Sequence, residues 1–204
     1  IVITCPKGIP PFLMEEVLRY RLEKFLDNEE KRPVKELVCV EKVFEGRIGW
    51  EGLKDVTLRF KSKIDRIDRL DDDSLLILDY KTGGGDLMPA SCERIGSQGW
   101  TRQHLKKTIR SFQLPLYFYF VQETAQGTRL NAGLYQLKEL NKDFGLKLFL
   151  KSEDDFGNID EMMAVFMKAL GFVCSEILDP GVAFEADPQD SFYCQGCPFF
   201  YLCR

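Results

Sequence analysis

The chain has 204 residues, of which 45% are hydrophobic, and a formal net charge of −4. This size predicts one domain with a packed core, spanning residues 1–204. No apolar run approaches the ~18 residues that a membrane-spanning helix needs, so the sequence argues against an integral membrane protein and predicts no membrane partner.

Hydrophobic periodicity predicts a helix and then strands in the first half of the chain. Apolar residues at helical spacing follow Pro10 and Pro11, which suit the start of a helix. The predicted elements are a helix at 12–26, a strand at 37–44, turns at 45–46 and 51–52, and a β-hairpin with arms at 58–67 and 75–80. An acidic turn at 71–74 joins the two arms, where Asp and Ser can hydrogen-bond their own backbone.

The second half of the chain begins with a stretch, residues 86–103, that has no period and predicts a long loop. The elements predicted after it are a helix at 111–122, strands at 130–137 and 146–150, and a helix at 159–177. The helix at 111–122 has a predicted core stripe of Phe112, Leu116, Tyr119 and Phe120. Pro115 predicts either a kink or a position in the first turn. The pattern alone indicates an α/β fold with a mixed sheet.

The hairpin carries ionisable residues within segments that are expected to be buried. Asp79 follows the apolar run 75–78, where an unpaired charge is unfavourable. Alternation puts Asp79 and Lys81 on one face, and Asp65 lies in the other arm. Two carboxylates and an ammonium could hold a divalent cation and orient a water beside it. The alternative is a salt-bridged hairpin, which the D-x-K tripeptide alone would favour.

Three motifs in this order resemble the PD-(D/E)XK nucleases of the RecB/AddB group: I-D-R-I-D-R at 64–69, L-D-Y-K-T-G at 78–83 and Q-L-P-L-Y at 113–117. The resemblance implies a restriction-endonuclease-like αβββαβ core at about residues 12–137, with a mixed central β-sheet flanked by helices. Residues 138–204 would then form a C-terminal extension with a helix and a Cys-rich tail.

The resemblance also implies a function and a set of roles. It implies a DNA nuclease, favouring an exonuclease, in a DNA repair and recombination helicase–nuclease whose helicase domain or subunit would be a partner. Asp65, Asp79 and the Tyr80 carbonyl would bind Mg²⁺ or Mn²⁺, and Lys81 would assist the attacking water. Gln113 and Tyr117 would border the active site and help to hold DNA.

Charge is distributed unevenly along the chain. Between Arg94 and Gln122 there are five basic residues and no acidic ones, whereas residues 152–190 contain ten acidic residues and one lysine. The basic segment predicts phosphate contacts by Arg102, Lys106, Lys107 and Arg110. The alternative is a solvated helix face without a role in binding.

The cysteines indicate a compartment and a second metal site. Seven cysteines, an odd number, argue against a secreted disulfide framework and favour the cytoplasm. The closely spaced Cys194, Cys197 and Cys203 suit zinc or an iron–sulfur cluster. In AddB-like nucleases such a motif supplies three ligands to a 4Fe–4S cluster. Cys5 is the N-terminal candidate for the fourth ligand, which could instead precede Ile1, and the alternative is three buried thiols without a cluster.

Two features depart from the family's pattern. The family commonly has a His on an N-terminal helix as a further metal ligand, but the single histidine, His104, lies in the basic segment. Glu15, Glu16, Glu23 and Glu41 are acidic candidates for that position. The chain begins with Ile1 rather than Met, so we expect a fragment that lacks part of the N-terminal site. The alternative function is therefore a weak or inactive DNA-end-binding module with the same fold.

Overall fold

The computed structural model describes residues 11–50, 53, 56–83, 88–96, 99–125, 127–138, 140, 145–185, 194 and 197–202. Its centre is a five-stranded sheet with the order β1-β2-β3-β4-β5. The strands are β1 Val34–Gly49, β2 Thr57–Leu70, β3 Leu75–Lys81, β4 Leu130–Gln136 and β5 Leu146–Leu148. The helices are α1 Pro11–Glu30, α2 Cys92–Gly96, α3 Arg102–Thr108, α4 Gln113–Ala125, α5 Glu153–Gly157 and α6 Ile159–Leu178, and a 3-10 turn covers Phe200–Leu202.

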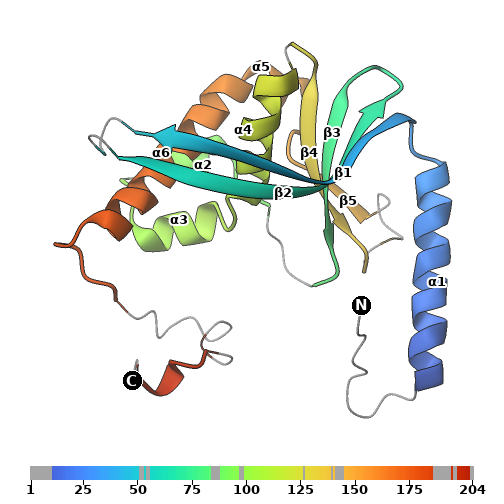
Figure 1. Cartoon of the computed structure of the whole chain (residues 1–204), viewed down its shortest axis with the longest axis horizontal. Helices are drawn as coiled ribbons and strands as arrows, with labels where there is room; N and C mark the ends of the chain where they lie inside the picture. Colours follow the sequence, from blue (N-terminus) through green and yellow to red (C-terminus); the bar gives the residue numbers. More distant parts are fainter. Residues whose placement is uncertain are drawn as a thin grey trace.

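The sheet is mixed, as predicted. Strands β1, β2 and β3 form an antiparallel meander, and β5 pairs antiparallel with β4. Strands β3 and β4 run parallel, and such a pair requires a crossover, which the segment from α2 to α4 supplies. Figure 1 shows α1 on one side of the sheet and α4 and α6 on the other. The αβββαβ core and the C-terminal helix are therefore confirmed.

Strand β1 is longer than its alternation predicts, and the predicted turn at 45–46 is wrong. Glu45 pairs with Lys61 and Gly46 with Phe60 inside the β1–β2 ladder. Most side chains of β1 are exposed, so its sequence alternates only weakly between apolar and polar residues. The backbone pairing with β2 nevertheless extends to Gly49. Gly46 is required by packing, because a Cβ atom there would lie 2.6 Å from the ring of Phe120.

The long loop predicted at 86–103 is also wrong in part, because α2 and the start of α3 lie within it. Helices of five and seven residues contain too few turns to show a helical period. The local signal for α3 is its N-cap, where the Thr101 hydroxyl accepts the His104 backbone N–H. Helix α4 then begins at Gln113 and places Pro115 in its first turn, where proline is tolerated.

The hydrophobic core lies between the sheet and the helices α4 and α6. It includes Ile64 and Ile77 from the sheet, Phe118 from α4 and Phe166 from α6. The predicted stripe of α4 is confirmed in part, since Phe120 is buried and Phe112 and Tyr119 are half-buried and pack against the core. The buried residues of α4 are Leu114, Pro115, Tyr117, Phe118, Phe120, Val121 and Ala125. The face that carries Tyr117 is turned toward the sheet, and the core is thus built around the motif residues.

No helix in the described ranges combines the length and the hydropathy needed to cross a bilayer.

Candidate active site

The site lies where strands β2 and β3 separate. The paired register of these strands ends at Arg66 opposite Leu78. Beyond this pair, Asp65 Oδ2 accepts the backbone N–H of Tyr80 at 2.9 Å, so a side chain replaces the next strand hydrogen bond. The N–H and C=O of one residue in an extended strand face the same neighbour. The Tyr80 carbonyl is therefore directed to the side of Asp65, as its predicted role requires.

Helix α4 supplies the other side of the site through Gln113. Its Oε1 accepts a hydrogen bond from the Lys81 ammonium at 2.8 Å. Its Nε2 donates to Asp79 Oδ1 at 2.5 Å and to the Tyr117 hydroxyl at 2.7 Å. The Tyr117 hydroxyl in turn donates its one proton to the Lys63 carbonyl at 2.8 Å. Every polar atom of the Gln113 side chain is thus used to position the strand-borne residues.

Asp79 is the buried charge of this network, with 3% of its surface exposed. Burial raises the pKa of Asp79, and the neighbouring Asp65 charge acts in the same direction, while Lys81 and Tyr117 oppose the shift. Its buried Oδ2 atom is paired with the Lys81 ammonium, which lies 2.6 Å away. Because a carboxylate oxygen can accept more than one partner, Oδ2 retains capacity for a further ligand beside Lys81.

These residues fit a divalent metal of the Mg²⁺ type. Such an ion keeps several waters and takes one or two protein carboxylates, so Asp65, Asp79 and the Tyr80 carbonyl are a sufficient set of oxygen donors. The observation that favours a ligand there is the approach of Asp65 to the Tyr80 backbone beside the buried Asp79 carboxylate. Within the described residues, no group of three or more His, Cys, Asp or Glu side chains is arranged to hold a metal.

A family model described as "PD-(D/E)XK nuclease superfamily" matches residues 9–204. The chain belongs to this superfamily. A search of curated proteins gave no match. A solved structure titled "Crystal structure of SSO0001" shares 14% sequence identity with this chain and covers 93% of it and 71% of its own chain, with a TM-score of 0.36.

The opposite face of the same hairpin carries charged residues that the motif of the PD-(D/E)XK superfamily did not single out. Arg66 and Asp68 alternate with Asp65 and so point toward α1. Asp68 is fully buried and accepts hydrogen bonds from Arg66 and Arg32, and Glu29 pairs with both arginines. The signal for this cluster lies within I-D-R-I-D-R, where Arg66 and Asp68 are two positions apart and so share the face opposite Asp65.

The four residues predicted to contact phosphates lie on α3 and just after it. Lys106, Lys107 and Arg110 are exposed. Arg102 is engaged within the protein, because its Nε lies 2.8 Å from Glu176 Oε2 and its amino groups donate to the Ala183 carbonyl. The acidic α6 therefore neutralises one member of the basic segment.

The remaining predicted ligands are only partly described. The Cys197 N–H donates to the Cys194 carbonyl at 3.2 Å, whereas Cys5 and Cys203 lie outside the described residues. The metal cluster of the tail thus stays a prediction. Of the acidic candidates for the N-terminal ligand of the superfamily, Glu15 and Glu16 pair with Arg19, and Glu41 pairs with Lys63. The contacts of Glu15 and Glu16 involve no residue of the site, whereas Lys63, the partner of Glu41, accepts the Tyr117 hydroxyl through its carbonyl.

Proposed function

We propose that the chain is a metal-dependent deoxyribonuclease that hydrolyses phosphodiester bonds from DNA ends. The observation that carries this proposal is the buried Asp79, whose pKa stays raised by burial although Lys81 lies 2.6 Å from its Oδ2 atom. A further cation beside this carboxylate would stabilise its ionised form. Membership of the PD-(D/E)XK superfamily supports the same reading.

The chemistry divides among the residues as follows. When bound, Mg²⁺ or Mn²⁺ supplies a Lewis acid for the scissile phosphate and lowers the pKa of a coordinated water. Asp65 and Asp79 provide the carboxylates that hold it, and the Tyr80 carbonyl is a third oxygen. Lys81 provides a fixed positive charge beside the attacking water and offsets the negative charge that develops on the phosphate. Gln113 holds Lys81 and Asp79 in register through its two contacts.

We further propose a RecB/AddB-like helicase–nuclease as the setting of this domain. The order of the three motifs supports that subgroup. In that setting the chain would act on DNA during repair and recombination, beside a helicase domain or subunit. The iron–sulfur cluster on Cys194, Cys197 and Cys203 belongs to the same proposal.

A DNA-end-binding module without catalysis is the second candidate. It is favoured by the count of carboxylates, since the described part of the chain brings two and not three acidic side chains to the site.

The test is a cleavage assay on linear and on covalently closed circular DNA of the same sequence, with Mg²⁺, with Mn²⁺ and with EDTA. We expect metal-dependent loss of the linear DNA only. Cleavage of the circle would contradict exonuclease action, and binding of ends without cleavage in either metal would favour the second candidate. Asp79→Asn is the control that separates this activity from a contaminating nuclease.

A further inference from the structure

The arm formed by residues 43–49 of β1 and 57–63 of β2 has one face toward the protein and one face toward solvent. The inner face carries Ile48 and Phe60, and Gly46 of that face meets the ring of Phe120 on α4. The alternate residues point to solvent and include four cations: Arg47, Arg59, Lys61 and Lys63. The three cations on β2 have side chains that are 58–71% exposed.

These cations outnumber the carboxylates that pair with them. Two glutamates, Glu41 and Glu45, share the three cations of β2. Arg47 has no ion pair with another described residue and stands directly opposite Arg59 in the β1–β2 register. Like charges in directly opposed positions are destabilising, and an anion between the two guanidinium groups would relieve the repulsion. Because exposed ion pairs contribute little to stability, the cations that are paired remain available to such an anion.

The alternative role of these charges is to protect the edge of the sheet. Charged side chains hinder the pairing of an edge strand with another chain, and β1 is an edge strand of this sheet. Charges of either sign serve that purpose equally, so edge protection gives no reason to set Arg47 against Arg59. Cations at successive outward positions of β2 fit a ligand with repeated negative charges better.

The arm is joined to the active site through Lys63. The Lys63 carbonyl accepts the Tyr117 hydroxyl at 2.8 Å, and Gln113 donates to the same hydroxyl and to Asp79. The row of cations therefore begins at the network that positions the site. Alternate residues of a strand lie ~6.6–6.8 Å apart, so the cations of β2 follow one another at a spacing close to that of successive phosphates along a DNA strand.

We propose that the outer face of the arm binds the phosphate backbone of the DNA that flanks the scissile bond, with one phosphate beside each of Lys63, Lys61 and Arg59. The inference rests on the proposed nuclease function and adds the path that the DNA takes away from the site. Contacts between cations and phosphates fix the position of DNA without reading its sequence. Arg47 would share the phosphate beside Arg59, which accounts for the two opposed arginines.

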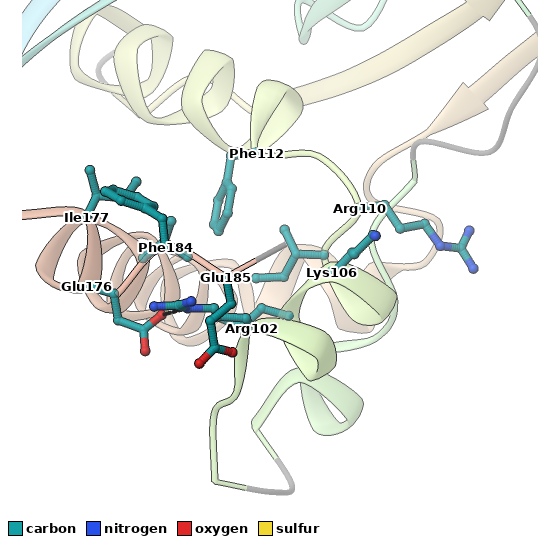
Figure 2. A pocket seen from close by; sticks show the side chains of 11 residues that line it. Arg102, Lys106, Arg110, Phe112, Glu176, Ile177, Phe184 and Glu185 are labelled. Carbon is teal, nitrogen blue, oxygen red and sulfur yellow. Dashed lines mark hydrogen bonds and ion pairs between the residues drawn. The ribbon is translucent and has the colours of Figure 1, made fainter. Parts of the chain in front are cut away.

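The first test is the slope of log K against log salt for a blunt duplex, measured by fluorescence anisotropy with EDTA present to prevent turnover. Lys61→Gln should reduce this slope by about 0.9, because one phosphate contact is lost. The matched control is Arg102→Gln, which removes the same charge from a cation that is turned toward Glu176 of α6 at 2.8 Å (Figure 2). The slope of this control should stay at the wild-type value.

The second test is a gain of binding, which a misfolded variant cannot produce. Glu45→Gln removes the carboxylate that competes with phosphates for Arg59 and Lys61. Duplex binding should tighten by a factor of up to about 5, which corresponds to the ~1 kcal/mol that an exposed ion pair contributes at most. The matched control is Glu36→Gln, which frees Arg69 from an exposed pair at the other end of β1 and β2 and should leave the affinity unchanged.

Neutral methylphosphonate linkages, placed one at a time along the duplex, locate the contact. One position should weaken binding by wild type but not by Lys61→Gln, because both changes remove the same contact. If wild type binds and cleaves DNA while Lys61→Gln and Glu45→Gln behave as their controls do, the arm proposal is overturned and the nuclease proposal stands. If wild type neither binds nor cleaves DNA, both proposals fail.

Discussion

The two faces of the β2–β3 hairpin both carry a carboxylate buried away from water, but different numbers of cations balance the two carboxylates. Toward α1, Asp68 accepts hydrogen bonds from Arg66 and Arg32, and Glu29 completes the group. Burial lowers the pKa of Arg66, but hydrogen bonds to Asp68 and to Tyr80 outweigh this and raise it overall. Toward α4, Asp79 is almost as enclosed, but Lys81 is the cation that lies against it, and burial keeps its pKa raised.

This difference separates charges that hold the fold together from charges that act on a ligand. On the α1 face, two arginines donate to the buried Asp68. On the α4 face, burial keeps the pKa of Asp79 raised despite its ion pair with Lys81. A further cation that binds Asp79 in the working protein would offset this unfavourable burial.

The largest expected effect is on stability, at the α1 face. Asp68→Ala should lower the free energy of unfolding by about 3–5 kcal/mol, because two buried arginines lose their common partner. Urea denaturation measures this change. Glu36→Ala is the matched control, since Glu36 also pairs with an arginine across β1 and β2 but is exposed, and its loss should change stability by about 1 kcal/mol or less. Equal effects of the two substitutions would contradict a structural role for the buried group.

The next effect is on catalysis, at the α4 face. Asp79→Asn and Lys81→Ala should each lower the cleavage rate by a factor of about 10²–10³ or more, because each removes a charge that acts in the transition state. Stability without metal should not fall in Asp79→Asn, because the buried carboxylate is unfavourable when ionised, as its raised pKa indicates. Initial cleavage rates and gel shifts test this together. Full cleavage by either variant would show that the substituted residue is not part of the active site.

The third prediction concerns metal and pH. The pKa of Asp79 is higher in the folded protein than the ~3.9 of an unfolded chain. Asp79 therefore stabilises the fold at a pH below ~3.9, and this stabilisation is lost as the pH rises through the folded-state pKa. Metal binding needs the ionised form. Stabilisation by Mn²⁺, about 2.7 kcal/mol at a hundredfold excess over Kd, should therefore appear only above the raised pKa and grow with pH. Thermal melts of wild type and Asp79→Asn measure it, and an equal Mn²⁺ response in both would refute the assignment.

The smallest effect is expected at Arg110. Arg110→Asn should reduce the slope of log K against log salt by about 0.7 on single-stranded DNA, the value for one lost phosphate contact. Stability should be unchanged, because Asn tolerates the left-handed backbone of this position. Arg19→Gln, an exposed substitution on α1, is the control. An unchanged slope would favour the alternative, in which the basic segment is a solvated helix face without a role in DNA binding.

The long elements and the order of the core could be predicted from the sequence, because β3, β4, α4 and α6 are long enough to show their period and are enclosed by the core. The contact of Gln113 with Asp79 could be anticipated only through the resemblance, since no local pattern links residues 34 positions apart. The α1-facing cluster was missed because its partners, Glu29 and Arg32, follow the end of the predicted helix and look like solvated charges. Helices α2 and α3 were missed because they are short.

The arm formed by β1 and β2 crosses over the helices of the active-site side (Figure 1). Gly46 meets the ring of Phe120 on α4, and Trp50 lies against Gly171 on α6, with its indole N–H donating to the Met167 carbonyl at 2.7 Å. Helix α4 is thus enclosed between sheet and arm, whereas α3 is mostly exposed. In hydrogen exchange, the amides of α4 should exchange only when the whole domain unfolds. The amides of α3 should exchange through local unfolding and therefore faster. The network on α4 would then keep its shape while the neighbouring segment adjusts to the DNA.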